Sequence, residues 1–223
     1  YGKYAVYPGN NFENHLIPFV EGAFNLDNGT KKVGSIMPYY TISFDQDQKN
    51  YENVANAYSK YLITDLLRDK FNYDEVVCTD WCVTGDEPTS MMSLTSGDHC
   101  WGVEDGYTVA QRHYKVLEAG VDQFGGNKDP QPILEAYDLM VKEHGKEVAE
   151  KRFRKSAYRI LKNMFRVGLF ENPYINPKTA ADYVGTTKFV EAGIDAQIKS
   201  TVMLKNKSNV LPLSMNKPKV YIP

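Results

Sequence analysis

The 223-residue chain is poor in cysteine and histidine and has almost no net charge, and each of these scarcities excludes a class of protein. Its three cysteines cannot all pair within one chain, as the cysteines of a disulfide scaffold do. A net charge of −2 offers no basic excess for nucleic acid or an anionic membrane surface. No apolar run reaches the length of a membrane span, and no basic segment followed by an apolar one opens the chain. We therefore expect neither a nucleic-acid nor a membrane partner.

Metal and cofactor motifs are also missing. A zinc set can be drawn from Cys78, Cys82, His99 and Cys100. Its spacing matches no standard zinc site, and Cys78 falls inside a predicted strand. A calcium-loop pattern beginning at Asp45 fails because Lys49 stands where an oxygen ligand belongs and Asn50 where the loop needs glycine. No glycine-rich phosphate loop opens any predicted helix. We predict no metal site and no cofactor.

The remaining composition is that of a globular protein, with 42% hydrophobic and 24% charged residues. Residues 33–40 and 76–79 each read as a buried strand, the second being a β-branched run typical of parallel sheets. Residues 50–71 between them carry apolar residues at helical spacing. The order strand, helix, strand predicts a parallel unit in an α/β protein.

Asp80 and Trp81 follow the second of these strands directly, and Tyr40 ends the first. Ligands of α/β proteins gather at the carboxyl ends of parallel strands, so these residues are candidates for a site. An aspartate after a strand is more often a turn former or a helix cap. The pattern alone leaves both interpretations of Asp80 open.

Other elements follow from the same periodicities. Residues 1–11 are expected to be a loop, and residues 82–102 a long one in which Trp101 is either a platform for a sugar or a plug at the loop's base. Further helices are predicted over residues 12–25, 108–118, 132–144, 146–166 and 189–204, and a strand over residues 219–222. The helix over residues 146–166 has an apolar stripe and seven basic residues from Lys151 onward, which we expect to form a solvated surface.

Several segments resemble the family 3 glycoside hydrolases and occur in that family's order. They are Met37-Pro38-Tyr39-Tyr40, Thr79-Asp80-Trp81, Ala119-Gly120-Val121-Asp122, the Gly-Leu-Phe at residues 168–170, the Leu-Lys-Asn at residues 204–206 and Leu211-Pro212-Leu213. The resemblance implies the C-terminal part of a TIM-like (β/α)8 barrel followed by the first elements of an α/β sandwich domain. It assigns residues 1–171 to the barrel, 172–188 to a linker and 189–223 to the start of the sandwich.

The resemblance also implies a function. Asp80 would be the nucleophile of a retaining β-glucosidase or β-xylosidase, with Tyr40, Trp81 and Met37 contacting the substrate. Asp122 is a weaker candidate, since a carboxylate inside a strand pattern can bond to neighbouring backbone. Cys82 departs from the glycine that commonly follows the tryptophan.

The resemblance places the acid/base and a Lys-His pair outside this chain, so we expect a fragment of a periplasmic or secreted enzyme, which would expose apolar surface. Its partner would be a glycoside or an oligosaccharide, and a homo-oligomer is left open. The alternative is a catalytically inactive carbohydrate-binding or structural piece of the barrel.

Overall fold

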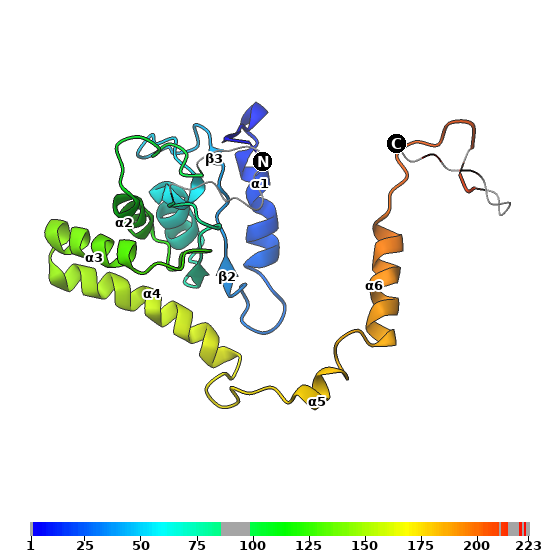
Figure 1. Ribbon diagram of the computed structural model, residues 1–223. Helices are drawn as coiled ribbons and strands as arrows, with labels where there is room; N and C mark the ends of the chain where they lie inside the picture. Colours follow the sequence, from blue (N-terminus) through cyan, green and yellow to red (C-terminus); the bar gives the residue numbers. More distant parts are fainter. Residues whose placement is uncertain (1, 86–98, 210, 214–218, 220, 222–223) are drawn as a thin grey trace. The chain divides into compact units, whose positions relative to one another are not determined.

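A computed structural model of the chain describes residues 2–85, 99–209, 211–213, 219 and 221 (Figure 1). The chain divides into two compact units, Tyr1–Phe170 and Glu171–Pro223. Each unit is described by itself below. No helix in the described ranges is both long enough and apolar enough to span a membrane.

Two pairs of short parallel strands form the centre of the first unit. Strand β2 (Ser35–Ile36) pairs with β4 (Val76–Val77), and a parallel bridge joins Cys78 to Gln123 on the other side of β4. The predicted parallel pairing of the two strands is confirmed, although each strand is only two residues long. Strand β1 (Tyr4–Ala5) pairs with β3 (Ile42–Ser43), so the prediction of a loop over residues 1–11 is wrong at its centre.

The predicted helix over residues 50–71 is confirmed only in its second half. A π-helix, η4, spans Tyr61–Lys70, and a 3-10 turn, η3, spans Asn56–Tyr58. The segment before them is extended because its polar groups bond to distant segments. The Ala55 backbone N–H donates to the carbonyl of Trp101 at 2.8 Å, and the Asn56 side chain accepts a hydrogen bond from the Ser43 N–H at 3.2 Å. These tertiary hydrogen bonds outweigh helix periodicity here.

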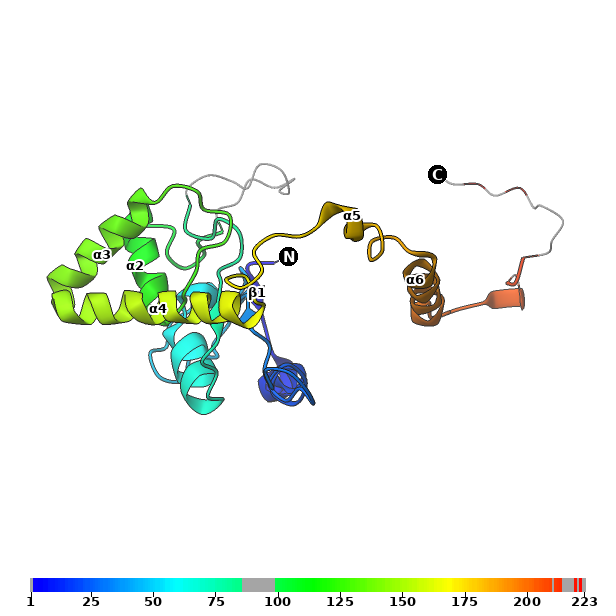
Figure 2. The same cartoon turned by 90° about the horizontal axis from the view of Figure 1, so that it is seen from below.

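Four further helical segments surround the strands. Helix α1 (Phe12–Ile17) continues into a π-helix, η2 (Pro18–Ala23), and α2 (Val109–Ala119), α3 (Gln131–His144) and α4 (Lys146–Arg166) match their predicted ranges closely. Helix α2 begins with a capping box between Thr108 and Gln111 and ends at Gly120, whose φ of 109° favours glycine. Helices α2 and α3 pack side by side, as do α3 and α4 (Figures 1 and 2).

The core of the unit lies between β4 and the helices. Its fully buried side chains include Tyr58, Tyr73, Val77, Val116 and Val121, which come from η3, the β4 region, α2 and the segment after α2. A smaller apolar cluster joins α2, α3 and α4. The main core therefore fixes β4 and the segment that follows α2 against each other.

Helix α4 turns part of its basic side inward. The prediction of a solvated basic surface is confirmed at Lys151, Arg154 and Lys155, which are exposed, but it is wrong for Arg159. Arg159 is only 8% exposed and forms ion pairs with Asp122 at 2.9 Å and Asp74 at 2.7 Å, while Arg166 pairs with Glu75 at 2.7 Å. The carboxylates around β4 attract this face of the helix. The expected exposure of apolar surface is found on the same helix, at Val148, Leu161, Met164 and Phe165.

The second unit contains two helices and a 3-10 turn. Helix α5 (Pro177–Ala180) lies inside the range predicted as a linker, and α6 (Thr187–Ser200) is the helix predicted over residues 189–204. The turn η5 spans Lys207–Asn209. The strand predicted over residues 219–222 lies largely outside the described residues. The assignment of the two units to a barrel and a sandwich remains a prediction.

Candidate active site

The site predicted at the end of β4 begins with Thr79, whose side chain is fully buried. Its backbone N–H donates to the Gln123 carbonyl at 2.9 Å, and its hydroxyl accepts a hydrogen bond from the Gly125 N–H at 2.8 Å. These bonds hold the end of β4 to residues 123–125. The next residue, Asp80, therefore leaves a fixed strand end.

The Asp80 carboxylate is half-buried at this strand end. Its Oδ1 accepts a hydrogen bond from the Trp81 backbone N–H at 2.7 Å. Burial, followed by the negative charge of Asp80, raises the pKa of the neighbouring Cys78 thiol. The Cys78 thiol therefore remains protonated near neutral pH. Because Asp80 is only partly buried, its carboxylate stays accessible.

Tyr40 lies beside this strand end, but its hydroxyl contacts backbone. Tyr40 follows β2 by four residues and Trp81 follows β4 by four residues. The hydroxyl donates to the Trp81 carbonyl at 2.6 Å, and the ring packs on His99 with centroids 4.4 Å apart. We expected this hydroxyl on Asp80 or on a sugar; the structure shows it holding the backbone after Asp80. Met37, after β2, is 52% exposed.

The Trp81 indole lies over two glycines and is 57% exposed. A Cβ atom on Gly125 would lie 2.8 Å from the ring, and one on Gly126 would lie 2.6 Å from it. Only residues without side chains allow this approach. Analysis of the sequence missed this pair, although consecutive glycines after a predicted strand were a signal of a close backbone approach.

Cys82 adopts a backbone conformation that favours glycine, with φ of 54°. Its N–H donates to the Gly125 carbonyl at 2.9 Å, which ties the turn after Trp81 to the glycine pair. The departure from glycine noted in the sequence therefore falls where a side chain has an energetic cost. Its Sγ lies 3.6 Å from the Gly126 carbonyl oxygen.

Asp122, the weaker catalytic candidate, is buried in a network of hydrogen bonds. Its Oδ2 accepts from Arg68 at 2.6 Å and from the Val77 backbone N–H at 3.1 Å. Its Oδ1 accepts from the Ser156 hydroxyl and from Arg159, both at 2.9 Å. The bond to the Val77 N–H is the backbone contact that the strand pattern suggested, so Asp122 fastens β4 to η4 and α4.

The residues of the two metal patterns rejected from the sequence have other surroundings in the fold. Within the described part of the chain, no metal-sized group of ligand atoms includes a cysteine. Asp47 instead accepts hydrogen bonds from the Lys49 and Asn50 backbone N–H groups at 2.9 and 2.7 Å, which closes the 45–50 loop on itself. Trp101 packs against the main core, which supports its interpretation as a plug at the base of its loop.

Comparisons with known proteins relate the chain to one group of enzymes. No profile of a known protein family matches the chain. The chain is 38% identical over 214 residues to β-glucosidase C of Emericella nidulans, covering 96% of this chain and 32% of that protein. It is 37% identical over 222 residues to a periplasmic β-glucosidase/β-xylosidase of Dickeya chrysanthemi, covering 96% of this chain and 32% of that protein. The chain is therefore similar to β-glucosidases and β-xylosidases, the enzymes that its resemblance to the family 3 glycoside hydrolases predicts.

Solved structures show that the chain shares its fold with known enzymes. A β-glucosidase involved in saponin metabolism from intestinal bacteria superposes with a TM-score of 0.61 over 91% of this chain and 22% of its own, at 24% identity. A glycoside hydrolase family 3 β-N-acetylglucosaminidase from Paenibacillus gives 0.56 over 84% of this chain and 31% of its own, at 18% identity. The chain spans about a third of the length of the curated β-glucosidases it matches first.

Proposed function

We propose that this chain carries the nucleophile of a retaining β-glycosidase that removes terminal β-linked glucose or xylose. The observation that carries the proposal is the placement of Asp80. Its carboxylate is half-buried and accessible at the carboxyl end of parallel strand β4, in a chain 38% identical to a β-glucosidase over nearly its whole length. Carboxyl ends of parallel strands are where α/β enzymes place catalytic groups.

The proposed chemistry needs two carboxyl groups. In the first step an Asp80 oxygen forms a bond to the anomeric carbon while the glycosidic bond breaks, and an acid protonates the leaving oxygen. In the second step water, deprotonated by the same group, displaces Asp80 and releases the sugar. The acid/base lies outside these 223 residues in this proposal, so catalysis requires the parent polypeptide.

The residues around Asp80 take positioning and binding roles in this proposal. The Trp81 N–H holds one carboxylate oxygen, and Tyr40 holds the Trp81 carbonyl, so Asp80 is presented in one orientation. The exposed face of the Trp81 indole offers an apolar surface for a pyranose ring. Met37, exposed after β2, would line the same edge.

The architecture and the location of the parent enzyme belong to the same proposal. The first unit would be the C-terminal half of a (β/α)8 barrel and the second unit the start of an α/β sandwich, as the family resemblance implies. Parallel pairing of β1 with β3 and of β2 with β4 supports the barrel assignment. The periplasmic relative from Dickeya chrysanthemi supports a periplasmic or secreted enzyme.

Mechanism-based labelling tests this function. A 2-fluoro glycoside slows release of the covalent sugar, so we expect the parent enzyme to gain its mass on one peptide that contains Asp80. Asp80→Asn should lose turnover by orders of magnitude and take up no label, with its unfolding midpoint unchanged. Asp105→Asn, at an exposed aspartate, is the matched control and should keep both its turnover and its uptake of the label. Failure of the parent enzyme to take up label would instead support the inactive carbohydrate-binding alternative.

A further inference from the structure

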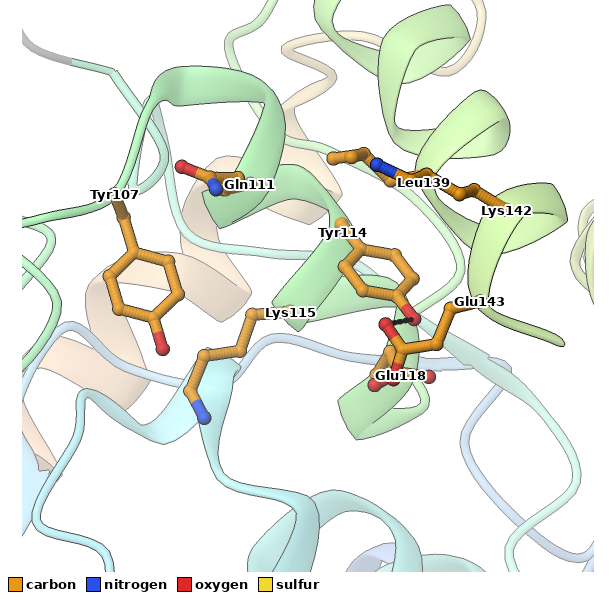
Figure 3. Close-up of a pocket in the computed structure, with 8 residues that line it drawn as sticks. All are labelled: Tyr107, Gln111, Tyr114, Lys115, Glu118, Leu139, Lys142 and Glu143. Carbon is orange, nitrogen blue, oxygen red and sulfur yellow. Dashed lines mark hydrogen bonds between the residues drawn. The ribbon is translucent and has the colours of Figure 1, made fainter.

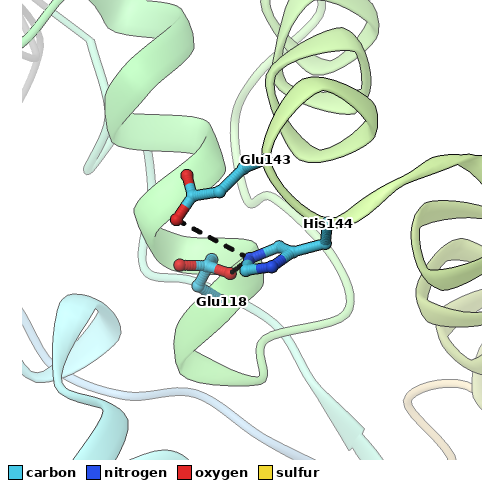
Figure 4. A group of neighbouring side chains, drawn as sticks. All are labelled: Glu118, Glu143 and His144. Carbon is cyan, nitrogen blue, oxygen red and sulfur yellow. Dashed lines mark hydrogen bonds and ion pairs between the residues drawn. The ribbon is translucent and has the colours of Figure 1, made fainter.

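The ends of α2 and α3 bring two glutamates and a histidine together, far along the chain from Asp80. Glu118 lies in the last turn of α2, and Glu143 and His144 end α3 (Figure 4). One ligand atom from each residue lies within 4.8 Å of the other two. The set is exposed on the first unit and takes no part in the glycosidase site proposed above.

The separations between these atoms suit a first-row transition metal. The His144 Nε2 atom lies 2.9 Å from Glu118 Oε1 and 3.9 Å from Glu143 Oε1. Ligands at the zinc distance of about 2.0–2.1 Å in a tetrahedron lie about 3.3–3.4 Å apart, which falls between the two observed separations. Shifts of about 0.5 Å in exposed side chains would therefore complete the geometry.

Tyr114 supplies the support that metal ligands commonly have. Its hydroxyl donates to Glu143 Oε2 at 2.8 Å and lies 3.1 Å from His144 Nε2, so one hydroxyl orients two of the three residues. Partners of this kind fix the orientation of a ligating carboxylate.

Helix direction adds to the preference for a cation. Both α2 and α3 end at the cluster, and the carboxyl end of a helix carries a partial negative charge. Three protein ligands leave a fourth tetrahedral position. A cavity of about 530 Å³ adjoins Glu118 and Glu143 and is lined also by Tyr107, Gln111, Tyr114 and Lys115 (Figure 3). Water or a small anion can reach the metal from that side.

We propose that Glu118, Glu143 and His144 form a Zn²⁺ site whose fourth ligand comes from the adjoining cavity. An imidazole with two carboxylates favours zinc over magnesium or calcium, which take oxygen ligands in larger numbers. The proposal is independent of the hydrolytic reaction, because none of its residues contacts Asp80, Trp81 or Tyr40 through a hydrogen bond in the described ranges.

Zinc titration of the full chain tests the site, with the His144 ring nitrogens followed by ¹⁵N NMR. We expect one equivalent of Zn²⁺ to shift the Nε2 signal of His144 and leave that of His15 in place. His144→Ala and Glu118→Gln should each weaken binding by more than about 100-fold, and Tyr114→Phe, which removes only the supporting hydroxyl, by about 10–100-fold. His15→Ala removes another exposed histidine and should bind Zn²⁺ as the native chain does.

The readout on His144 separates this site from the three cysteines, which also bind zinc when accessible. The proposal is overturned if Zn²⁺ leaves the His144 resonances unchanged. It is equally overturned if Glu118→Gln, whose amide keeps a hydrogen-bonding partner for His144, binds Zn²⁺ as tightly as the native chain. In both cases the three residues form only a surface ion pair.

Discussion

The Tyr40 hydroxyl donates a 2.6 Å hydrogen bond to the backbone carbonyl of Trp81. The phenol is 7% exposed, so the bond joins the segment after β2 to the segment after β4 in a place shielded from water. It therefore fixes the carbonyl of the residue that follows Asp80, and the backbone N–H of that same residue donates to the Asp80 carboxylate.

Tyr40→Phe should loosen this strand end without removing the ring. We expect a loss of about 1–3 kcal/mol in the free energy of unfolding, because the Trp81 carbonyl loses a buried donor. In the parent enzyme we also expect a lower kcat with KM less affected. Urea unfolding and steady-state kinetics measure the two effects. Tyr51→Phe, at a ring that is 82% exposed, is the control and should change both much less.

Gly125→Ala should displace the Trp81 indole. The new Cβ would lie 2.5 Å from the Thr79 carbonyl oxygen and 2.8 Å from the indole ring, and the backbone oxygen has little room to move. We expect a loss of about 1–3 kcal/mol and a changed near-UV circular dichroism signal from the indole. An unchanged signal and midpoint would mean that the ring does not lie over the glycines.

A matched glycine tests whether the effect comes from that contact. Gly193 lies within α6, and a Cβ there would meet nothing within 4 Å. Gly193→Ala should therefore stabilise its helix by about 0.5–1 kcal/mol. Both substitutions add one methyl group. If Gly125→Ala lowers the free energy of unfolding while Gly193→Ala raises it, the loss comes from the collision with Trp81 and Thr79.

Asp122→Asn should be among the most destabilising single changes in the first unit. The carboxylate pairs with Arg68 at 2.6 Å and Arg159 at 2.9 Å and has Arg152 at 3.7 Å, all with side chains mostly buried. Burial lowers the pKa of Arg152 to about 10 despite the Asp122 charge, so losing that charge leaves three cations poorly compensated. We expect a loss of about 3–5 kcal/mol, measured by urea unfolding.

The control for this substitution is Asp138→Asn, at an exposed aspartate of α3. It makes the same change of charge and should alter stability by less than about 0.5 kcal/mol. Equal effects of the two substitutions would contradict the assignment of Asp122 as the fastening residue between β4, η4 and α4.

Asp74 should make the stability of the first unit depend on acid pH. Burial alone would raise the pKa of Asp74, but hydrogen bonds from Lys155 and Arg159 lower it to about 2 from an ordinary 3.8. A carboxyl whose folded pKa is depressed contributes stability above its unfolded pKa and loses it as pH falls through the folded pKa. Its contribution should therefore disappear between about pH 5 and pH 2.

Urea unfolding at pH 5 and pH 2.5 gives the stability that each chain loses between the two pH values. The difference in this loss between the native chain and Asp74→Asn measures the contribution of Asp74. The native chain should lose more stability across that window than Asp74→Asn, which has no carboxyl to protonate. Since the Asp74 side chain is 48% exposed, solvent screening limits the difference to less than about 1 kcal/mol. Parallel losses in the two chains would show that these ion pairs do not matter for stability.

Local pattern was sufficient for most of the elements and for the position of the candidate nucleophile. Apolar spacing predicted α2, α3 and α4 within about two residues, because a helix that buries one face must repeat that face in sequence. The β-branched run before Asp80 predicted the buried strand β4, and the order of elements predicted its parallel pairing with β2.

Tertiary structure decided which groups each side chain meets. Part of the basic side of α4 faces inward, because the carboxylates of Asp74, Glu75 and Asp122 come from segments more than 30 residues away. Residues 50–59 do not form the predicted helix, because hydrogen bonds join this segment to Ser43 and Trp101. The Tyr40 hydroxyl donates to the Trp81 carbonyl and not to the Asp80 carboxylate. The apolar periodicity of a sequence depends only on residues that are close along the chain. Hydrogen bonds and ion pairs form between any groups that the folded backbone brings close together.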